Sequence, residues 1–166
     1  EPDVFVQSTV NRASKVLSGS LTKQEKMEEL ESIAKETVDI NGIGSYTLGK
    51  HRKNLTIEQT RIYRNLFEKY FLKTFTSRLA EYTNPEVRVE LSDKLNKNYT
   101  MVHSILVATE QRSEIKIDWR IYTKDPENLL IRDLIIEGLS LARTQKEEFN
   151  SIISSNNGNV DYLFVS

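Results

Sequence analysis

Apolar residues in the first forty positions recur every three or four residues, which predicts two amphipathic helices. The apolar face of the first comprises Val6, Val10, Ala13 and Leu17. Gly19 should end this helix, and Thr22 with Glu25 forms a capping-box pattern that should begin the second. Three glycines fall within residues 39–49, where we expect a short, irregular helix that bends the chain.

The strongest helical pattern covers residues 56–82. Thr56 and Gln59 form a second capping box at its start, and apolar positions then follow one broad face for about seven turns. These positions are Tyr63, Leu66, Phe67, Tyr70, Phe71, Phe75, Leu79 and Tyr82. So many large side chains on one helix predict either a large core or one wall of a ligand cavity.

After Asn84-Pro85 the period changes to two, which is typical of β-strands. One strand pattern begins at Val87, and three more cover residues 101–107, 115–122 and 129–136. The last of these is apolar on both faces, so we expect it to be central in the sheet. Short connections predict an antiparallel meander. A final helix should cover residues 141–154 with Ser140 as its N-cap, which makes residues 1–166 a single α+β domain.

The composition excludes several classes of function. The chain has 23 basic and 24 acidic residues and a net charge of −1, unlike a nucleic-acid-binding domain or a polybasic membrane anchor. It contains no cysteine, which excludes thiolate zinc sites, thiol nucleophiles and disulfides. No run approaches the roughly 18–20 apolar residues of a spanning helix, so we expect no stable membrane insertion. The two histidines lack metal-ligand spacing, and we expect no metal site.

The start of the chain leaves the compartment open. Glu1-Pro2-Asp3 shows no charged or apolar region of a signal peptide. Either the protein is cytosolic, or a signal peptide is absent from this sequence.

Two strand carboxylates are the candidates for catalysis. Asp118 or Asp133 could act as a general base if it faced a cleft. Alternatively, Asp118 lies on the solvent face and Asp133 pairs with an arginine. No partner acid or base can be identified, so we predict no catalytic residue. Residues 50–53 also contain a small basic cluster, which suits either a lipid phosphate or a solvated surface.

Several motifs together resemble the MlaC (toluene-tolerance auxiliary) family of periplasmic phospholipid-binding proteins. They are Val38-Asp39, Leu48-Gly49-Lys50, Thr56-x-Glu58-Gln59, Ile117-Asp118-Trp119-Arg120 and the segment from Asp133 to Leu141, with Phe149 in the closing helix. The resemblance covers about residues 22–149. The chain departs from the family pattern at Arg52, Leu129 and residues 144–146, which affects partner contacts and cavity edges more than the fold.

The resemblance implies a fold and a role. The fold is α+β, with N-terminal helices and a C-terminal helix packed on a curved four-stranded antiparallel sheet (a cystatin-like cone) and an apolar cleft between them. The role is to shuttle phospholipid through the periplasm, between an inner-membrane ABC-type lipid transporter complex and an outer-membrane lipoprotein–porin complex. It implies no catalysis, and no cofactor other than bound phospholipid as cargo.

On this basis we predict the lipid-binding residues. One wall should be formed by Phe67, Tyr70, Phe71, Phe75 and Leu79, and the other by Ile117, Trp119, Ile121, Leu134 and Ile136. Leu139 should form the lip, and Trp119 should lie near the mouth with its N–H free for water or a head group. The cavity should measure several hundred Å³, roughly as ligand pockets do. The alternatives are an isomerase-like enzyme with the same cleft and a protein-interaction domain with a solid core.

Overall fold

The computed structural model describes residues 1–165. This part of the chain contains five α-helices, two 3-10 helices, four longer strands and a two-residue fifth strand. The α-helices are α1 (Pro2–Ser18), α2 (Lys23–Thr37), α3 (Ile40–Leu48), α4 (Ile57–Leu79) and α5 (Leu141–Ser155), with 3-10 helices η1 (Gly49–Asn54) and η2 (Val160–Val165). The strands are β1 (Val87–Lys94), β2 (Tyr99–Leu106), β3 (Ile115–Tyr122), β4 (Leu130–Ile136) and β5 (Leu139–Ser140). The predicted α+β class is confirmed.

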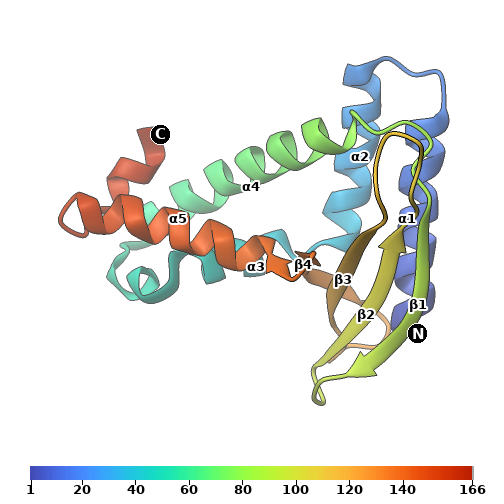
Figure 1. Ribbon diagram of the computed structural model, residues 1–166. Coiled ribbons are helices and arrows are strands. Elements are labelled where there is room, and N and C mark those ends of the chain that lie inside the picture. Colours follow the sequence, from blue (N-terminus) through green and yellow to red (C-terminus); the bar gives the residue numbers. More distant parts are fainter. Residues whose placement is uncertain (166) are drawn as a thin grey trace.

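The sheet and the helices occupy different ends of the molecule (Figure 1). Helix α1 runs along the sheet, whereas α3, α4 and α5 extend away from it as an arm, with α2 between the two parts. Helices α4 and α5 lie close together at the far end of the arm and diverge toward the sheet. None of the helices within residues 1–165 has the length and apolar composition that a bilayer crossing requires.

Local sequence signals explain where the helices begin. The two predicted capping boxes are present: Thr22 caps α2 and Thr56 caps α4, each exchanging hydrogen bonds with the residue three positions on. Helix α4 ends at Leu79, three residues earlier than expected, because the chain turns before Asn84-Pro85. There Asn84 takes a positive φ of 48°.

The sheet is antiparallel in the order β1-β2-β3-β4-β5, so the expected four strands are supplemented by a fifth. Strand β5 has two residues, too few for an alternating pattern. It pairs through Ile136 and Leu139 across a turn in which Glu137 (φ 51°) and Gly138 (φ 83°) both adopt left-handed conformations. The expectation that β4 is central was wrong, because only this short strand lies beyond it. Apart from Arg132 and Asp133, strand β4 is apolar on both faces, and α3 and α5 pack against it.

Helix α1 is fixed to the edge strand by one side chain. The Gln7 amide donates to the Val87 carbonyl oxygen at 3.3 Å and accepts from the Val89 N–H at 3.1 Å. It thereby occupies backbone groups that an edge strand leaves open to other chains.

The buried apolar side chains form two clusters. The helical cluster joins α2, α3, α4, α5 and η2, with Tyr63, Phe67 and Ile153 among its members. The sheet cluster places Val6 and Val10 of α1 against one face of the sheet, at Val102, Trp119, Ile121 and Ile131. Val38, at the end of α2, packs against both clusters. Val38 is thus a side chain at which the two clusters adjoin.

Candidate functional site

The aromatic face of α4 forms a ladder of stacked rings. Tyr63, Phe67, Phe71 and Phe75 are spaced four residues apart, which places them on one side of the helix. Their successive ring centroids lie 5.8, 6.1 and 5.4 Å apart. Tyr63 and Phe67 are each 5% exposed, but Phe71 and Phe75 are only half-buried. Burial therefore decreases along the ladder toward the C-terminal end of α4.

Helix α5 covers the buried end of the ladder. The Phe149 ring meets Tyr63 and Phe67 edge-on, each at a centroid distance of 6.4 Å. Burial raises the pKa of Tyr63 to about 12, with the Thr47 hydrogen bond opposing the rise. Tyr70, predicted to face the cargo, is 44% exposed and donates to Gln145 Oε1 at 3.4 Å. This end of the arm is filled by side chains, so the remaining open apolar surface lies at Phe71, Phe75 and Leu79.

On the sheet, apolar side chains form a row across neighbouring strands. Ile117 pairs with Ile136, and Ile136 pairs with Leu139, so all three side chains lie on the same face. Ile117 and Ile136 are half-buried, and Leu139 is 59% exposed. Leu134, also half-buried, occupies the next row, opposite Trp119. The row thus ends at an exposed leucine, where a lip of the cleft was predicted.

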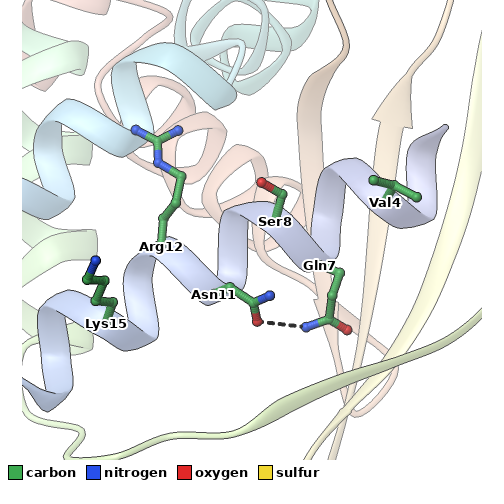
Figure 2. Close-up of a pocket in the computed structure, with 6 residues that line it drawn as sticks. All are labelled: Val4, Gln7, Ser8, Asn11, Arg12 and Lys15. Carbon is green, nitrogen blue, oxygen red and sulfur yellow. Dashed lines mark hydrogen bonds between the residues drawn. The ribbon is translucent and has the colours of Figure 1, made fainter.

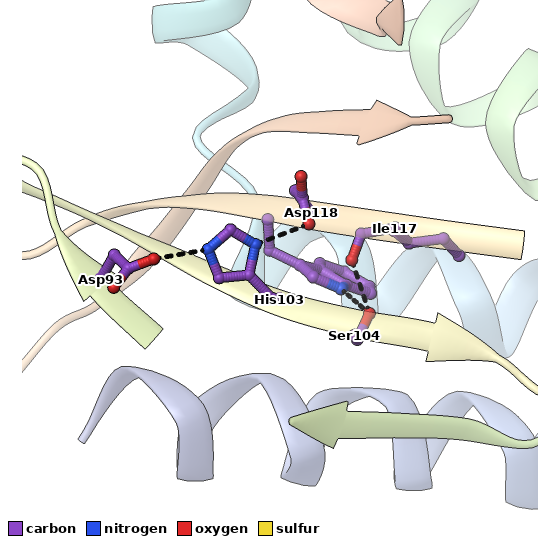
Figure 3. Close-up of polar contacts among 6 residues, drawn as sticks. Asp93, His103, Ser104, Ile117 and Asp118 are labelled. Carbon is purple, nitrogen blue, oxygen red and sulfur yellow. Dashed lines mark hydrogen bonds and ion pairs between the residues drawn. The ribbon is translucent and has the colours of Figure 1, made fainter. Parts of the chain in front are cut away.

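The structure separates the predicted sheet wall into two parts. Trp119 and Ile121 are buried beneath α1 in the sheet cluster, whereas Ile117, Leu134 and Ile136 are less completely covered. The expectation that Trp119 has a free N–H near the mouth was wrong, because Trp119 is 8% exposed and donates to Ser104 Oγ at 2.8 Å (Figure 3). The Ser104 hydroxyl donates in turn to the Ile117 carbonyl oxygen at 2.7 Å. The strand alternation placed these residues on one face correctly, but it carries no information about which part of that face α1 covers.

The two candidate catalytic carboxylates have structural partners. The Asp118 carboxylate forms a hydrogen bond with His103 Nδ1 at 2.8 Å. On the other side of the ring, His103 Nε2 lies 2.9 Å from Asp93 Oδ2 (Figure 3). This group lies on the outer face of the sheet, opposite the face that carries Trp119. The Asp118 hydrogen bond raises the pKa of His103, with burial opposing and Asp93 reinforcing the rise.

Asp133 does not pair with an arginine as expected. Its carboxylate accepts from the Ala142 N–H at 3.0 Å and from the Ser140 hydroxyl, at the start of α5. Ser140 is the predicted N-cap and accepts from the Arg143 N–H at 3.0 Å. Asp133 therefore joins β4 to α5. No group of three or more potential metal ligands occurs among the described residues.

Two surface hollows lie away from the predicted cleft. The larger, of about 490 Å³, runs along the outward side of α1; its lining residues are Val4, Gln7, Ser8, Asn11, Arg12 and Lys15 (Figure 2). The smaller, of about 200 Å³, lies between η1 and the first turns of α4 and includes Arg52, Lys53 and Arg64. Neither is the expected apolar cavity between α4 and the sheet, where half-buried side chains occur on both elements instead.

Comparisons with known proteins agree with this architecture. The model of the MlaC protein family matches residues 7–165. Among solved structures, a phospholipid-binding protein from Ralstonia solanacearum, determined in complex with a phospholipid, is 20% identical. The match covers 97% of this chain and 91% of that one, with a TM-score of 0.81, which establishes a shared fold. None of the curated proteins matches the chain.

Proposed function

Because the chain belongs to the MlaC family, we propose that it carries phospholipid, with the acyl chains held between the C-terminal half of α4 and the β3–β5 side of the sheet. The observation that carries this proposal is the incomplete burial of apolar side chains on both elements. Those side chains are Phe71, Phe75 and Leu79 on α4 and Ile117, Leu134, Ile136 and Leu139 on the sheet. The structurally similar Ralstonia protein was determined with a phospholipid, which supports this choice of cargo.

The other predicted residues have a supporting role in this proposal. Phe67 closes one end of the cleft, where α5 covers the aromatic ladder. Tyr70 lies where the cleft borders solvent. Trp119 and Ile121 lie on the same face of the sheet as the wall and pack against α1. Acyl chains would enter between α4 and the sheet, because apolar side chains of both elements are only partly buried there.

The energetics of transfer explain why a carrier is needed. Each methylene group shielded from water contributes about 0.8 kcal/mol, so a free phospholipid crosses an aqueous gap very slowly. A protein that shields the acyl chains lowers this barrier. A bilayer shields them equally well, so the direction of transfer has to come from the proteins at each membrane. We propose that these are the inner-membrane ABC-type transporter complex and the outer-membrane lipoprotein–porin complex, and that the protein acts in the periplasm.

The exposed lip allows a direct test of the cleft. Replacing Leu139 with aspartate places a charge beside the acyl chains, where desolvation costs several kcal/mol. We expect L139D to retain at least about tenfold less phospholipid than the wild type. The lipid-stripped forms of the two proteins should melt at the same temperature, because Leu139 is 59% exposed. Native mass spectrometry of protein purified from bacteria measures the retained lipid.

Leu91 supplies the matched control. It is a leucine of similar exposure, 54%, that pairs with His103 on the outer face of the sheet. L91D should retain phospholipid as the wild type does. A wild-type protein that is compact and carries no lipid would favour the interaction domain instead. A turnover activity that D118N abolishes in a folded protein would favour the enzyme.

A further inference from the structure

Arg112, in the loop between β2 and β3, has hydrogen-bond donors without partners. Its Nε and Nη2 atoms are buried from water and meet no acceptor among the described residues. A buried charged donor without an acceptor is costly, more so than a neutral one. These two donors of the Arg112 side chain therefore lack acceptors within residues 1–165.

The two unpartnered atoms are the pair that binds an anion bidentately. Nε–H and Nη2–H lie along one edge of the planar guanidinium, matching the oxygen spacing of a carboxylate or phosphate. The same chain uses this edge at Arg61, whose Nε donates to Glu58 Oε1 at 3.2 Å while Nη2 donates to Oε2. At Arg112 no carboxylate of residues 1–165 accepts from the same edge.

Nearby carboxylates do not neutralise Arg112. Of the ion pairs within residues 1–165, the one formed by Glu86 is with Arg88, at 3.5 Å. Glu110 and Glu114, in the same loop region, are exposed and form no ion pair with Arg112 in that part of the chain. The Tyr82 ring lies 5.4 Å from the guanidinium carbon. An aromatic ring interacts with the face of a guanidinium, so this contact leaves the donor edge for another group.

Arg112 lies where the two walls of the proposed cleft meet. Tyr82 follows the C-terminal end of α4 by three residues. On the sheet side, the loop joins Leu106 to Ile115. These two residues pair with each other at one end of the face that carries Ile117 and Ile136. Figure 1 shows the β2–β3 loop beside the point where the chain leaves α4. The contact between Arg112 and Tyr82 therefore joins α4 to this end of the sheet.

We propose that Arg112 binds the phosphate of the cargo lipid at the end of the cleft. This inference rests on the proposed carrier function and adds a head-group contact to it. The phosphate oxygens accept from Nε and Nη2, while the Tyr82 ring stays against the guanidinium face. The neighbours of Arg112 in the loop are exposed, so the loop can shift to open the donor edge to an entering head group.

The experiment compares two lipids with the same acyl chains, phosphatidylglycerol and diacylglycerol, which lacks the phosphate. Stripped protein is loaded with an equal mixture, and native mass spectrometry measures the bound ratio. The wild type should favour phosphatidylglycerol by about tenfold, the effect of a charge-assisted hydrogen bond. Arg112→Gln should bring the ratio close to one without reducing diacylglycerol binding, and Arg112→Lys should retain part of the preference.

Arg120 is the matched control, because its guanidinium lies 4.4 Å from the Tyr99 ring, on the outer face of the sheet. Arg120→Gln also removes a cation–π contact, and it should keep the wild-type ratio. Equal loss of both lipids in Arg112→Gln, with a lower melting temperature, would show that Arg112 only holds the loop. A wild type that binds both lipids equally would overturn the head-group contact alone, whereas a wild type that binds neither would overturn the carrier function as well.

Discussion

At the scale of single residues, His103 bridges two carboxylates on the outer face of the sheet. Its Nδ1 faces Asp118 and its Nε2 faces Asp93, and both neighbours favour the protonated ring. The hydrogen bond to Asp118 raises the pKa of His103 above the ordinary value of 6.5, while partial burial acts in the opposite direction. Protonation of His103 therefore stabilises the folded protein.

This arrangement predicts a pH dependence of stability. A group whose pKa is raised by folding contributes its full stabilisation below the unfolded value, and loses it as the pH rises through the folded value. The wild type should therefore lose stability relative to His103→Asn as the pH rises from about 6 to 8. Urea denaturation of both proteins at each pH measures the difference. A constant difference across this range would contradict the proposed protonation of His103.

At the scale of elements, Asp133 decides how α5 leaves the sheet. Its carboxylate accepts from the backbone of Ala142 and from the Ser140 hydroxyl, so it supplements the N-cap of α5. Helix α5 then carries Phe149 to the aromatic ladder of α4. A strand carboxylate that suggested catalysis in the sequence thus has a structural role in the folded chain.

We predict that Asp133→Ala lowers the free energy of unfolding by about 1–2 kcal/mol, the usual cost of losing a helix cap. Urea denaturation measures this cost. Asp125→Ala is a suitable control, because Asp125 accepts one backbone hydrogen bond, from Glu127 at 3.1 Å, in an exposed loop. Its effect should stay within about 0.5 kcal/mol. Equal effects of the two substitutions would show that Asp133 does not stabilise the α5 junction.

At the scale of the whole molecule, two hydrophobic clusters meet along a boundary that neither covers completely. The helical cluster is closed around Tyr63 and Phe67, and the sheet cluster is closed beneath α1. A bound acyl chain would complete the burial between them and connect the two parts. Cargo should therefore stabilise the folded molecule as a whole.

Lipid-loaded protein should melt at a higher temperature than stripped protein. Binding to the folded state alone adds about 2.7 kcal/mol at a free ligand concentration of ~100 Kd. Hydrogen exchange should slow mainly in the C-terminal half of α4 and in β4–β5, with little change where α1 meets β1. Calorimetry and exchange measured by mass spectrometry provide the two readouts. Equal melting temperatures for the loaded and stripped forms would argue against cargo at this boundary.

The sequence by itself determined the local features. The capping boxes at Thr22 and Thr56, the N-cap at Ser140 and the alternation in β3 are set by residues close together in the chain, so their patterns predicted the elements correctly. The absence of cysteine likewise excluded thiol and disulfide chemistry without any structure. The two-residue strand β5 was missed because it is too short to show a period.

The tertiary structure decided which faces meet. Residues of one strand face look alike in the sequence, but α1 buries Trp119 and leaves Ile136 half-covered, because helix packing depends on contacts between distant segments. The pairing of His103 with Asp118 and the unpartnered edge of Arg112 have the same origin. Periodicity reports which side of an element is apolar, whereas the partner of that side, whether another element or a ligand, is selected only when the whole chain is folded.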